Sequence, residues 1–318
     1  MSETSNHLSN AAPALRGELR GELRGELKYD EPMGRHVSWR TGGMAKVVYT
    51  PADRDDFASF LRQLPAGEPV MVMGLGSNSL VRDGGFAGTV ILTHAAAKHA
   101  EMAGDLVYAE VGVASPKVAR FAATRDFEGA EFLAGIPGSI GGALAMNAGC
   151  YGSETWEIVE KVDTIDRRGV IRVRPKADFD IGYRHCELKG GARIGIDEWF
   201  TGGYFRLAPG DGEASRARIK ELLTKRIASQ PLSLPNAGSV FRNPPGDHAA
   251  RLIEACGLKG LDRGGARVSE KHANFIVNPK GAARASDIEG LIETVRAEVR
   301  KQTGVDLHPE VRIFGEAA

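Results

Sequence analysis

A glycine-rich apolar segment constrains this chain more than any other feature of its sequence. It spans residues 135–152 and reads GIPGSIGGALAMNAGCYG. The segment holds too many glycines to be a stable helix throughout, and too many apolar residues to be a solvated loop. Because glycine lets a ligand come close to the backbone, the segment predicts contact with a large, flat ligand.

A second glycine-rich segment spans residues 74–86, reads GLGSNSLVRDGGF and directly follows a predicted strand, PVMVM. It has the form GxGxxS with no long helix after it, which argues against the dinucleotide fingerprint of a Rossmann fold. Its small residues can still present consecutive N–H groups and hydroxyls to a pyrophosphate. An ordinary tight turn would explain this segment equally well by itself, but the segment at 135–152 favours ligand binding.

Length and charge narrow the class of protein. A chain of 318 residues suggests two or three compact units, and 41 basic against 41 acidic residues argue against a nucleic-acid surface. No apolar run is long enough to span a bilayer, and the polar start MSETSNHLSN lacks the apolar core of a secretory signal. We therefore expect a cytoplasmic protein. The three widely spaced cysteines have no zinc-site spacing, so we expect reduced thiols and no metal.

Hydrophobic periodicity predicts an α+β chain. A helix follows Asp53, which can cap it, and another opens at Ser115-Pro116. Short strands separated by turn residues over 155–207 indicate an antiparallel sheet. Further on, we expect helices at 213–230 and 248–256 and a strand at ANFIV.

A long C-terminal helix is predicted from its start and stop signals. Ser286, with Glu289 three residues later, fits a capping box, and Gly304 ends the helix. Its buried stripe comprises Ile288, Leu291, Ile292, Val295 and Val299.

The N-terminal region contains an RGEL repeat with leucines at 15, 19, 23 and 27. This spacing places an apolar stripe on one helical face, but each repeat also contains a glycine, which disfavours a helix. We interpret the region as a surface helix or a disordered arm with a peripheral role.

Together, the two glycine-rich segments resemble the FAD-binding region of UDP-N-acetylenolpyruvoylglucosamine reductases, which have the vanillyl-alcohol-oxidase-like (PCMH) FAD fold. The resemblance extends from Trp39 to Gly315. It implies an α+β fold with a two-subdomain FAD-binding domain and a C-terminal α/β substrate-binding domain. The implied ranges are 1–33 for an N-terminal arm, 34–207 for the FAD domain (subdomains about 34–98 and 99–207) and 208–318 for the substrate domain. The short interval between Tyr183 and Ser239 resembles the shorter branch of the family.

The same resemblance implies how FAD is held. The diphosphate would be bound by Gly74, Gly76, Ser77, Asn78 and Ser79. The rest of the cofactor would lie near Gly135, Ile136, Pro137, Gly138, Ser139, Gly141, Gly142, Asn147 and Gly149. Neither segment contains a histidine, so we expect non-covalent FAD.

Reduction of an enolpyruvyl ether needs a hydride donor, an acid and stabilisation of an enolate. The motifs GYRHCELK, AGSVFRNP and LHPEVRIFG resemble the family's in order. By this resemblance Arg184 binds the substrate carboxylate and stabilises the enolate, Ser239 protonates the enolate carbon, and Glu310 assists on the enol intermediate. Without the flanking motifs, Arg184 would be read as a solvated surface group and Ser239 as a turn or cap residue.

Four further residues are candidates for binding the UDP-sugar: Tyr183, Arg242, Asn243 and Asn274. The chain departs from the commonest family pattern at His185-Cys186, at Arg242, where lysine is frequent, and at His308. An arginine in place of a lysine can alter substrate contacts, because the two cations hydrogen-bond differently.

The implied activity is NADPH-dependent reduction of UDP-N-acetylglucosamine enolpyruvate to UDP-N-acetylmuramate through bound FAD. This is a cytoplasmic step of peptidoglycan synthesis, and so of cell-wall biogenesis, cell shape and cell division. The partners would be the UDP-sugar and NADPH, with no nucleic acid and no membrane span. Two alternatives are an oxygen-using flavin oxidase on the same fold and a flavin-binding protein without turnover.

Overall fold

The computed structural model describes residues 23–94 and 99–318, which fall into two compact units. The first unit comprises the described residues up to Glu31, together with Ala45–Gly74 and Ala87–Leu223. The second unit comprises Pro32–Met44, Leu75–Phe86 and Thr224–Ala318. The chain therefore passes between the units several times, and the glycine-rich segment at 74–86 contributes to both.

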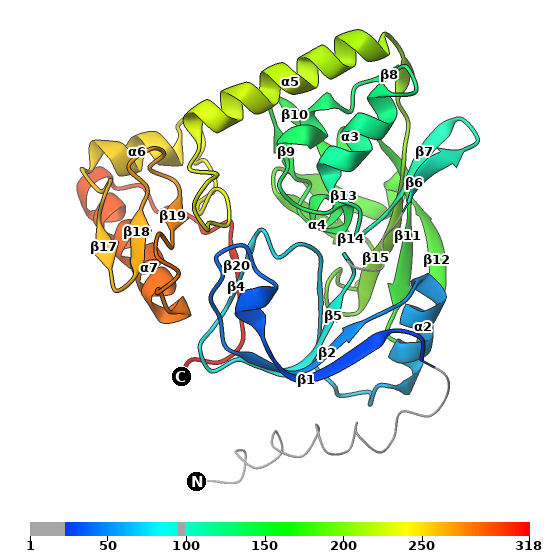
Figure 1. Cartoon of the computed structure of the whole chain (residues 1–318), viewed down its shortest axis with the longest axis horizontal. Helices are drawn as coiled ribbons and strands as arrows, with labels where there is room; N and C mark the ends of the chain where they lie inside the picture. The colour runs from blue at the N-terminus through cyan, green and yellow to red at the C-terminus, as the bar shows by residue number, and fades with distance from the viewer. Residues whose placement is uncertain (1–22, 95–98) are drawn as a thin grey trace. The chain divides into compact units, whose positions relative to one another are not determined.

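A four-stranded sheet and one helix form the beginning of the first unit (Figure 1). The strand order is β1 (Glu26–Pro32), β2 (Met44–Thr50), β5 (Phe86–Leu92) and β3 (Val70–Met73), with β3 parallel to β5. Helix α2 (Arg54–Gln63) begins where the Asp53 carboxylate accepts the Asp56 N–H at 2.9 Å, as predicted for its cap. Phe57, Phe60 and Leu61 on its buried face pack in one apolar cluster with Tyr49 and Ile91.

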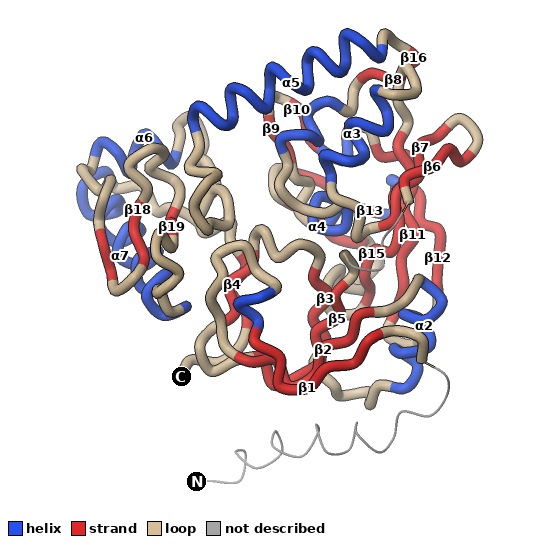
Figure 2. Tube along the Cα trace, in the orientation of Figure 1, coloured by secondary structure: helices blue, strands red, loops and turns tan. Residues whose placement is uncertain are grey.

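An antiparallel five-stranded sheet forms the rest of the first unit, as the spacing of turn residues predicts (Figure 2). Its order is β12 (Ile171–Pro175), β11 (Val159–Asp166), β15 (Glu198–Phe205), β7 (Leu106–Glu110) and β6 (Ala100–Ala103). Helix α3 (Ser115–Ala123) opens at Ser115-Pro116 as predicted.

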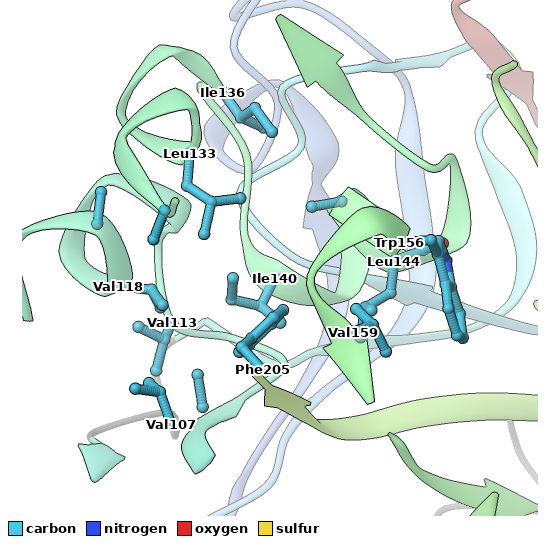
Figure 3. Close-up of a cluster of buried hydrophobic side chains, with 14 of the residues drawn as sticks. Val107, Val113, Val118, Leu133, Ile136, Ile140, Leu144, Trp156, Val159 and Phe205 are labelled. Atoms are coloured by element: carbon cyan, nitrogen blue, oxygen red, sulfur yellow. The ribbon is translucent and has the colours of Figure 1, made fainter. Parts of the chain in front are cut away.

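The glycine-rich segment at 135–152 is anchored in the core of this unit. Its central part forms the short helix α4 (Ile140–Ala145). Ile136, Ile140 and Leu144 are buried in a cluster with residues of the sheet, including Val107, Val159 and Phe205 (Figure 3). The apolar residues therefore fix the segment, while its glycines leave parts of the backbone uncovered.

Short elements complete the first unit. They are η2 (Glu131–Gly135), η3 (Thr155–Glu157), η4 (Lys176–Asp178), β8 (Phe127–Glu128), β9 (Gly149–Cys150), β10 (Ser153–Glu154), β13 (Phe179–Gly182), β14 (His185–Leu188) and β16 (Ala208–Pro209). The predicted charged helix is α5 (Gly212–Ser229).

The second unit packs helices α6 (Ala249–Ala255) and α7 (Ala285–Thr303) with a three-stranded antiparallel sheet. The strands are β17 (Asp262–Arg263), β18 (Ala266–Val268) and β19 (Ile276–Val277). Near the C-terminus β20 (Arg312–Phe314) pairs in parallel with β4 (Ser79–Val81), and η1 (Met33–Arg35) also belongs to this unit. All five predicted stripe residues of α7 are buried, and Gly304 ends the helix with a φ of 76°.

The predicted capping box of α7 is wrong. The helix begins at Ala285, and the Asp287 carboxylate accepts the Arg284 N–H at 2.9 Å. The other cap comes from far along the chain, because the Asp83 carboxylate accepts the N–H groups of Ala285 and Ser286, each at 2.9 Å. Glu289 instead pairs with Arg82 at 2.7 Å, so a tertiary contact replaces the local motif.

The RGEL repeats are described only at their end, since residues 15–22 lie outside the described residues. Leu23 and Leu27 are half-buried against the cluster that contains Phe57. Leu27 lies in β1, so the helical interpretation is wrong for this residue. Strand pairing at the sheet edge takes precedence over its four-residue spacing.

Three global features bear on function. Cys150, Cys186 and Cys256 are free thiols. In the described part of the chain no helix is long and apolar enough to cross a bilayer. The same residues contain no cluster of histidine, cysteine, aspartate or glutamate that could hold a metal ion.

Candidate active site

The two glycine-rich segments meet in the first unit. A Cβ atom added at Gly74 would lie only 2.0 Å from Ser139 Oγ, so the backbone of Gly74 lies directly against Ser139. Ser139 is itself buried. Any larger residue at position 74 would displace Ser139, which explains the glycine at the start of the first segment.

The rest of the first segment lies in the second unit and has N–H groups available to a ligand. Gly76 has a φ of 61°, and a Cβ there would lie 2.1 Å from His36 O. Across the described residues, the N–H groups of Leu75, Gly76 and Ser77 make no hydrogen bond. Consecutive unpaired N–H groups in a glycine-rich turn suit a phosphate group.

The second segment is held by main-chain hydrogen bonds, and Gly142 within it borders open space. Gly141 N–H donates to Val111 O at 2.8 Å, and Ile140 N–H donates to Val113 O at 2.9 Å. A Cβ at Gly135 would lie 2.6 Å from Cys150 Sγ, but a Cβ at Gly142 would meet nothing within 4 Å. The open face at Gly142 leaves room for a ligand against the backbone of this segment.

A pocket in the first unit adjoins both segments. Its lining residues are Pro51, Asp53, Arg54, Phe57, Thr93, Glu110, Val111, Gly112 and Thr201. Val111 is bonded to Gly141 of the second segment, and Thr93 N–H donates to Met73 O, next to Gly74, at 3.0 Å. The Thr201 hydroxyl is buried and has no hydrogen-bond partner within the described residues. Sequence reasoning missed this pocket because its residues come from four separate stretches of chain.

An ion pair between the half-exposed Arg54 and the buried Asp163 lies beside the pocket. Arg54 Nη1 lies 2.9 Å from Asp163 Oδ2, and the Tyr204 hydroxyl lies 3.3 Å from the same oxygen. Burial raises the pKa of Asp163, and the nearby Arg54 charge opposes this shift. Arg54 is therefore both a lining residue of the pocket and the ion-pair partner of Asp163.

Arg184 lies at the far end of the second segment. It occupies the two-residue turn between β13 and β14, next to Tyr183, with a φ of 53°. Nη2 donates to Gly149 O at 3.1 Å and Nη1 to Asn147 O at 3.4 Å. The guanidinium also lies 5.0 Å from the centre of the Tyr183 ring. The fold therefore brings Arg184 and Tyr183 to the predicted flavin-binding residues.

The Asn147 side chain holds this corner together. Nδ2 donates to Glu154 Oε2 at 2.7 Å and to Gly182 O at 3.0 Å, while Oδ1 accepts Trp156 N–H at 3.0 Å. Glu154 Oε1 lies 3.9 Å from Arg184 Nη1. Glu154 was missed by sequence reasoning, since a lone acid after a glycine-rich stretch carries no signal of its own.

Ser239 and Glu310 lie on neighbouring stretches of backbone in the second unit. Glu310 N–H donates to Val240 O at 2.7 Å, and Phe241 pairs with Pro309. The hydroxyl of Ser239 makes no hydrogen bond to the residues that the structure describes. A hydroxyl without a protein partner can donate its proton to a substrate.

The remaining candidates lie close to Ser239. Arg242 N–H donates to His308 O at 2.9 Å, and its buried Nε has no partner in the described chain, which suits an anion. The Asn274 side chain accepts Phe241 N–H at 2.9 Å and donates to Phe241 O at 2.8 Å. Asn243 Oδ1 accepts Ala249 N–H at the start of α6, at 3.1 Å. The two asparagine side chains therefore bond main-chain groups.

Comparison with known proteins gives two family matches. Residues 45–174 match an FAD binding domain, and residues 230–314 match the C-terminal domain of UDP-N-acetylenolpyruvoylglucosamine reductase. One range of the chain thus matches a cofactor-binding domain, and the other matches a domain of a named reductase.

Whole-length relatives agree. The UDP-N-acetylenolpyruvoylglucosamine reductase of Thiobacillus denitrificans is 58% identical, covering 96% of this chain and 94% of its own. That of Nitrosospira multiformis is 56% identical, covering 92% and 89%. The crystal structure of the Thermus caldophilus enzyme matches with a TM-score of 0.77 at 30% identity, covering 92% of this chain and 100% of its own.

Proposed function

The chain belongs to the UDP-N-acetylenolpyruvoylglucosamine reductase family, and from this premise we propose which of its residues perform the reaction. It is an FAD-dependent oxidoreductase that uses NADPH to reduce UDP-N-acetylglucosamine enolpyruvate to UDP-N-acetylmuramate. This step belongs to peptidoglycan precursor synthesis, and therefore to cell-wall biogenesis, cell shape and cell division. The family and the α+β FAD-binding fold predicted from the glycine-rich segments are confirmed.

Domain limits and cellular location are part of the proposal. The matched ranges, 45–174 and 230–314, fall inside the predicted FAD domain at 34–207 and substrate domain at 208–318. Residues 1–33 would form the N-terminal arm, and the FAD subdomains would meet near residue 98. The substrates are nucleotides and nucleotide sugars, so we assign the reaction to the cytoplasm.

The proposed cofactor site extends along both glycine-rich segments. FAD held there would supply the hydride for the reduction, with NADPH as its source. The N–H groups of Gly76 and Ser77 would bind the diphosphate, with Gly74, Asn78 and Ser79 shaping the turn. The second segment would contact the flavin side through Gly135, Ile136, Pro137, Gly138, Ser139, Gly141, Gly142, Asn147 and Gly149.

The pocket beside Arg54 would take the adenosine end. Val111 of the pocket accepts a hydrogen bond from Gly141, near the start of α4. Arg184 donates hydrogen bonds to Asn147 and Gly149, beyond the end of this helix. A six-residue helix separates these two places by about 9 Å along its axis. The flavin end belongs where Arg184 can meet the substrate, so the adenosine end belongs at the pocket.

Three side chains would perform the substrate chemistry. As hydride adds to one alkene carbon, negative charge develops on the enolate, where the permanently charged Arg184 would stabilise it. Ser239 would donate its proton to the other alkene carbon, and Glu310 would work with Arg184 on the enol intermediate. The observation that carries this assignment is the bond between Glu310 N–H and Val240 O, which places Glu310 next to the Ser239 stretch.

Binding of the UDP-sugar falls to residues around this group. Arg242, with its buried and unpartnered Nε, would meet an anionic group of the substrate. Tyr183 would line the site beside Arg184. Asn243 and Asn274 would contribute by fixing the main chain near Arg242.

The test is anaerobic stopped-flow absorbance at about 450 nm, with NADPH added first and the enolpyruvyl substrate second. The Ser239→Ala variant should be bleached by NADPH at the normal rate but reoxidised by substrate about 10²–10⁴-fold more slowly, because it lacks the acid. Ser229→Ala, on the exposed face of α5, is the control. Normal reoxidation of Ser239→Ala would remove Ser239 from the acid role, and recovery of wild type only with oxygen would favour an oxidase.

A further inference from the structure

We propose that Asn78 is a positioning residue, whose side-chain amide fixes Glu310 relative to the first glycine-rich segment. The inference rests on the role proposed for Glu310 above. It gives Asn78 a task that differs from the diphosphate contact expected from its place in the glycine-rich motif.

Two hydrogen bonds join Asn78 to the Glu310 stretch. Its Nδ2 donates to Glu310 O at 3.1 Å, and its backbone O accepts Arg312 N–H at 3.0 Å. The second bond continues the parallel pairing of β4 with β20, in which Ser79 lies opposite Arg312. The Asn78 side-chain amide thus extends the pairing of β4 with β20 from Arg312 back to Glu310, the residue with the proposed catalytic role.

The other side of Glu310 is tied to the Ser239 stretch. Glu310 N–H donates to Val240 O at 2.7 Å, and Val240 N–H donates to Asn274 O at 2.9 Å. Both main-chain groups of Glu310 are therefore bonded, the carbonyl by Asn78 and the N–H by the residue after Ser239. A continuous series of bonds joins the cofactor segment, Glu310 and Ser239.

The segment that carries Asn78 is itself firmly anchored. Arg82 pairs with Glu289 of α7 at 2.7 Å and donates to Gly315 O at 3.2 Å. Asp83 accepts two N–H groups at the start of α7. Asn78 therefore links Glu310 to a segment that is itself held in place by α7.

The chemistry explains why asparagine is needed. The Glu310 carbonyl requires a donor, which aspartate and leucine lack, and serine is too short to replace Nδ2. Catalytic geometry is sensitive to displacement, since a shift of about 1 Å can lower a rate by about 10²-fold. A small movement of Glu310 should thus slow the substrate half-reaction without affecting the transfer from NADPH.

The decisive variant is Asn78→Leu, which removes the donor and keeps the shape. FAD affinity, measured by flavin fluorescence on the apoprotein, and bleaching by NADPH should each change by less than about 3-fold. Reoxidation by the enolpyruvyl substrate should slow by about 10- to 100-fold. Strong loss of FAD affinity with normal reoxidation of the remaining holoenzyme would overturn the inference and leave Asn78 as a cofactor ligand.

A double-mutant cycle tests whether Asn78 acts through Glu310. If it does, Asn78→Leu combined with Glu310→Gln should be no more than about 3-fold slower than Glu310→Gln alone. Fully multiplicative effects would overturn the inference. A normal rate for Glu310→Gln would overturn the role of Glu310 and this inference together, whereas a slow Glu310→Gln with a normal Asn78→Leu would overturn the inference alone.

A matched control separates positioning from a general loss of stability. Asn278, in the same unit, also donates through Nδ2 to a main-chain oxygen, that of Trp39, at 3.0 Å. Asn278→Ser should lower the melting temperature without slowing reoxidation of the folded holoenzyme, whereas Asn78→Ser should slow reoxidation. Equal slowing in both serine variants would overturn the inference. If Asn78→Leu does not fold, Asn78→Ser takes its place in the reoxidation measurement.

Discussion

Arg184 acquires its candidate role through an unusual backbone conformation. Its φ of 53° lies in the left-handed region, which costs a non-glycine residue about 1–2 kcal/mol. The turn between β13 and β14 imposes this angle, and the side chain then reaches the carbonyls of Asn147 and Gly149. Held on two acceptors, the guanidinium is oriented before any substrate carboxylate arrives.

The corresponding prediction is for Arg184→Lys. A lysine keeps the charge but cannot bond both carbonyls and still present a planar pair of donors to a carboxylate. We expect a higher KM for the enolpyruvyl substrate and reoxidation slower by about 10²-fold, with normal bleaching by NADPH. Stopped-flow absorbance measures both steps. Arg206→Lys, a change in an exposed ion-paired arginine of the same unit, should leave both unaffected, and a wild-type KM for Arg184→Lys would contradict the proposal.

Among the elements, helix α4 shows how apolar and glycine residues divide their tasks. Ile140 and Leu144 are fully buried and fix the helix in the core. Gly141 is bonded to Val111 and packs closely against it, whereas Gly142 borders open space. No contact within the described residues explains why position 142 is a glycine. A cofactor lying against this position would explain it.

Gly142→Ala therefore separates folding from cofactor binding. Without cofactor, the variant should be as stable as wild type or about 0.5–1 kcal/mol more stable, since alanine favours a helix. Its affinity for FAD should fall about 10-fold, because a methyl group forced into a packed contact costs about 1–3 kcal/mol. Fluorescence titration of the apoprotein with FAD and urea unfolding measure the two effects. Gly67→Ala, also in open space, should not alter FAD affinity, and an unchanged affinity for Gly142→Ala would place the cofactor elsewhere.

For the whole molecule, each unit contains its own hydrophobic core, and we expect the stability of the second unit to depend on pH through His272. Its Nδ1 is buried and has no hydrogen-bond partner in the described chain, and its ring meets Phe275 edge-on. Burial, together with the charge of Lys259, lowers the pKa of His272. The folded state therefore binds this proton less readily than the unfolded chain, in which a histidine titrates at about 6.5.

We accordingly expect acid to destabilise the protein through His272. As the pH falls below about 6.5, the unfolded chain takes up the proton first, so the free energy of unfolding decreases. His272→Phe should show a smaller decrease between about pH 7.5 and about pH 5.5 than wild type. Urea unfolding at the two pH values measures the difference. Equal decreases in both proteins would show that His272 does not contribute.

Local signals in the sequence correctly predicted the elements whose stabilising contacts are close in the chain. Asp53 caps α2 by bonding Asp56, three residues on, and Gly304 ends α7 in a left-handed conformation that glycine favours. The two glycine-rich segments were sufficient to identify the family, because backbone that must approach a cofactor closely tolerates few other residues. The roles of Arg184, Ser239 and Glu310 stay predictions.

By itself, the sequence therefore determined the main helices, the antiparallel sheet, the family and the candidate residues. Only the tertiary structure decided that Asp83 caps a helix about 200 residues away, that Arg184 bonds Asn147 and Gly149, and that the Asn78 amide holds Glu310. The physical reason is the separation along the sequence between the residues that make each contact. A cap or a helical stripe is stabilised within a few residues, whereas these contacts exist only after segments distant in sequence have packed together.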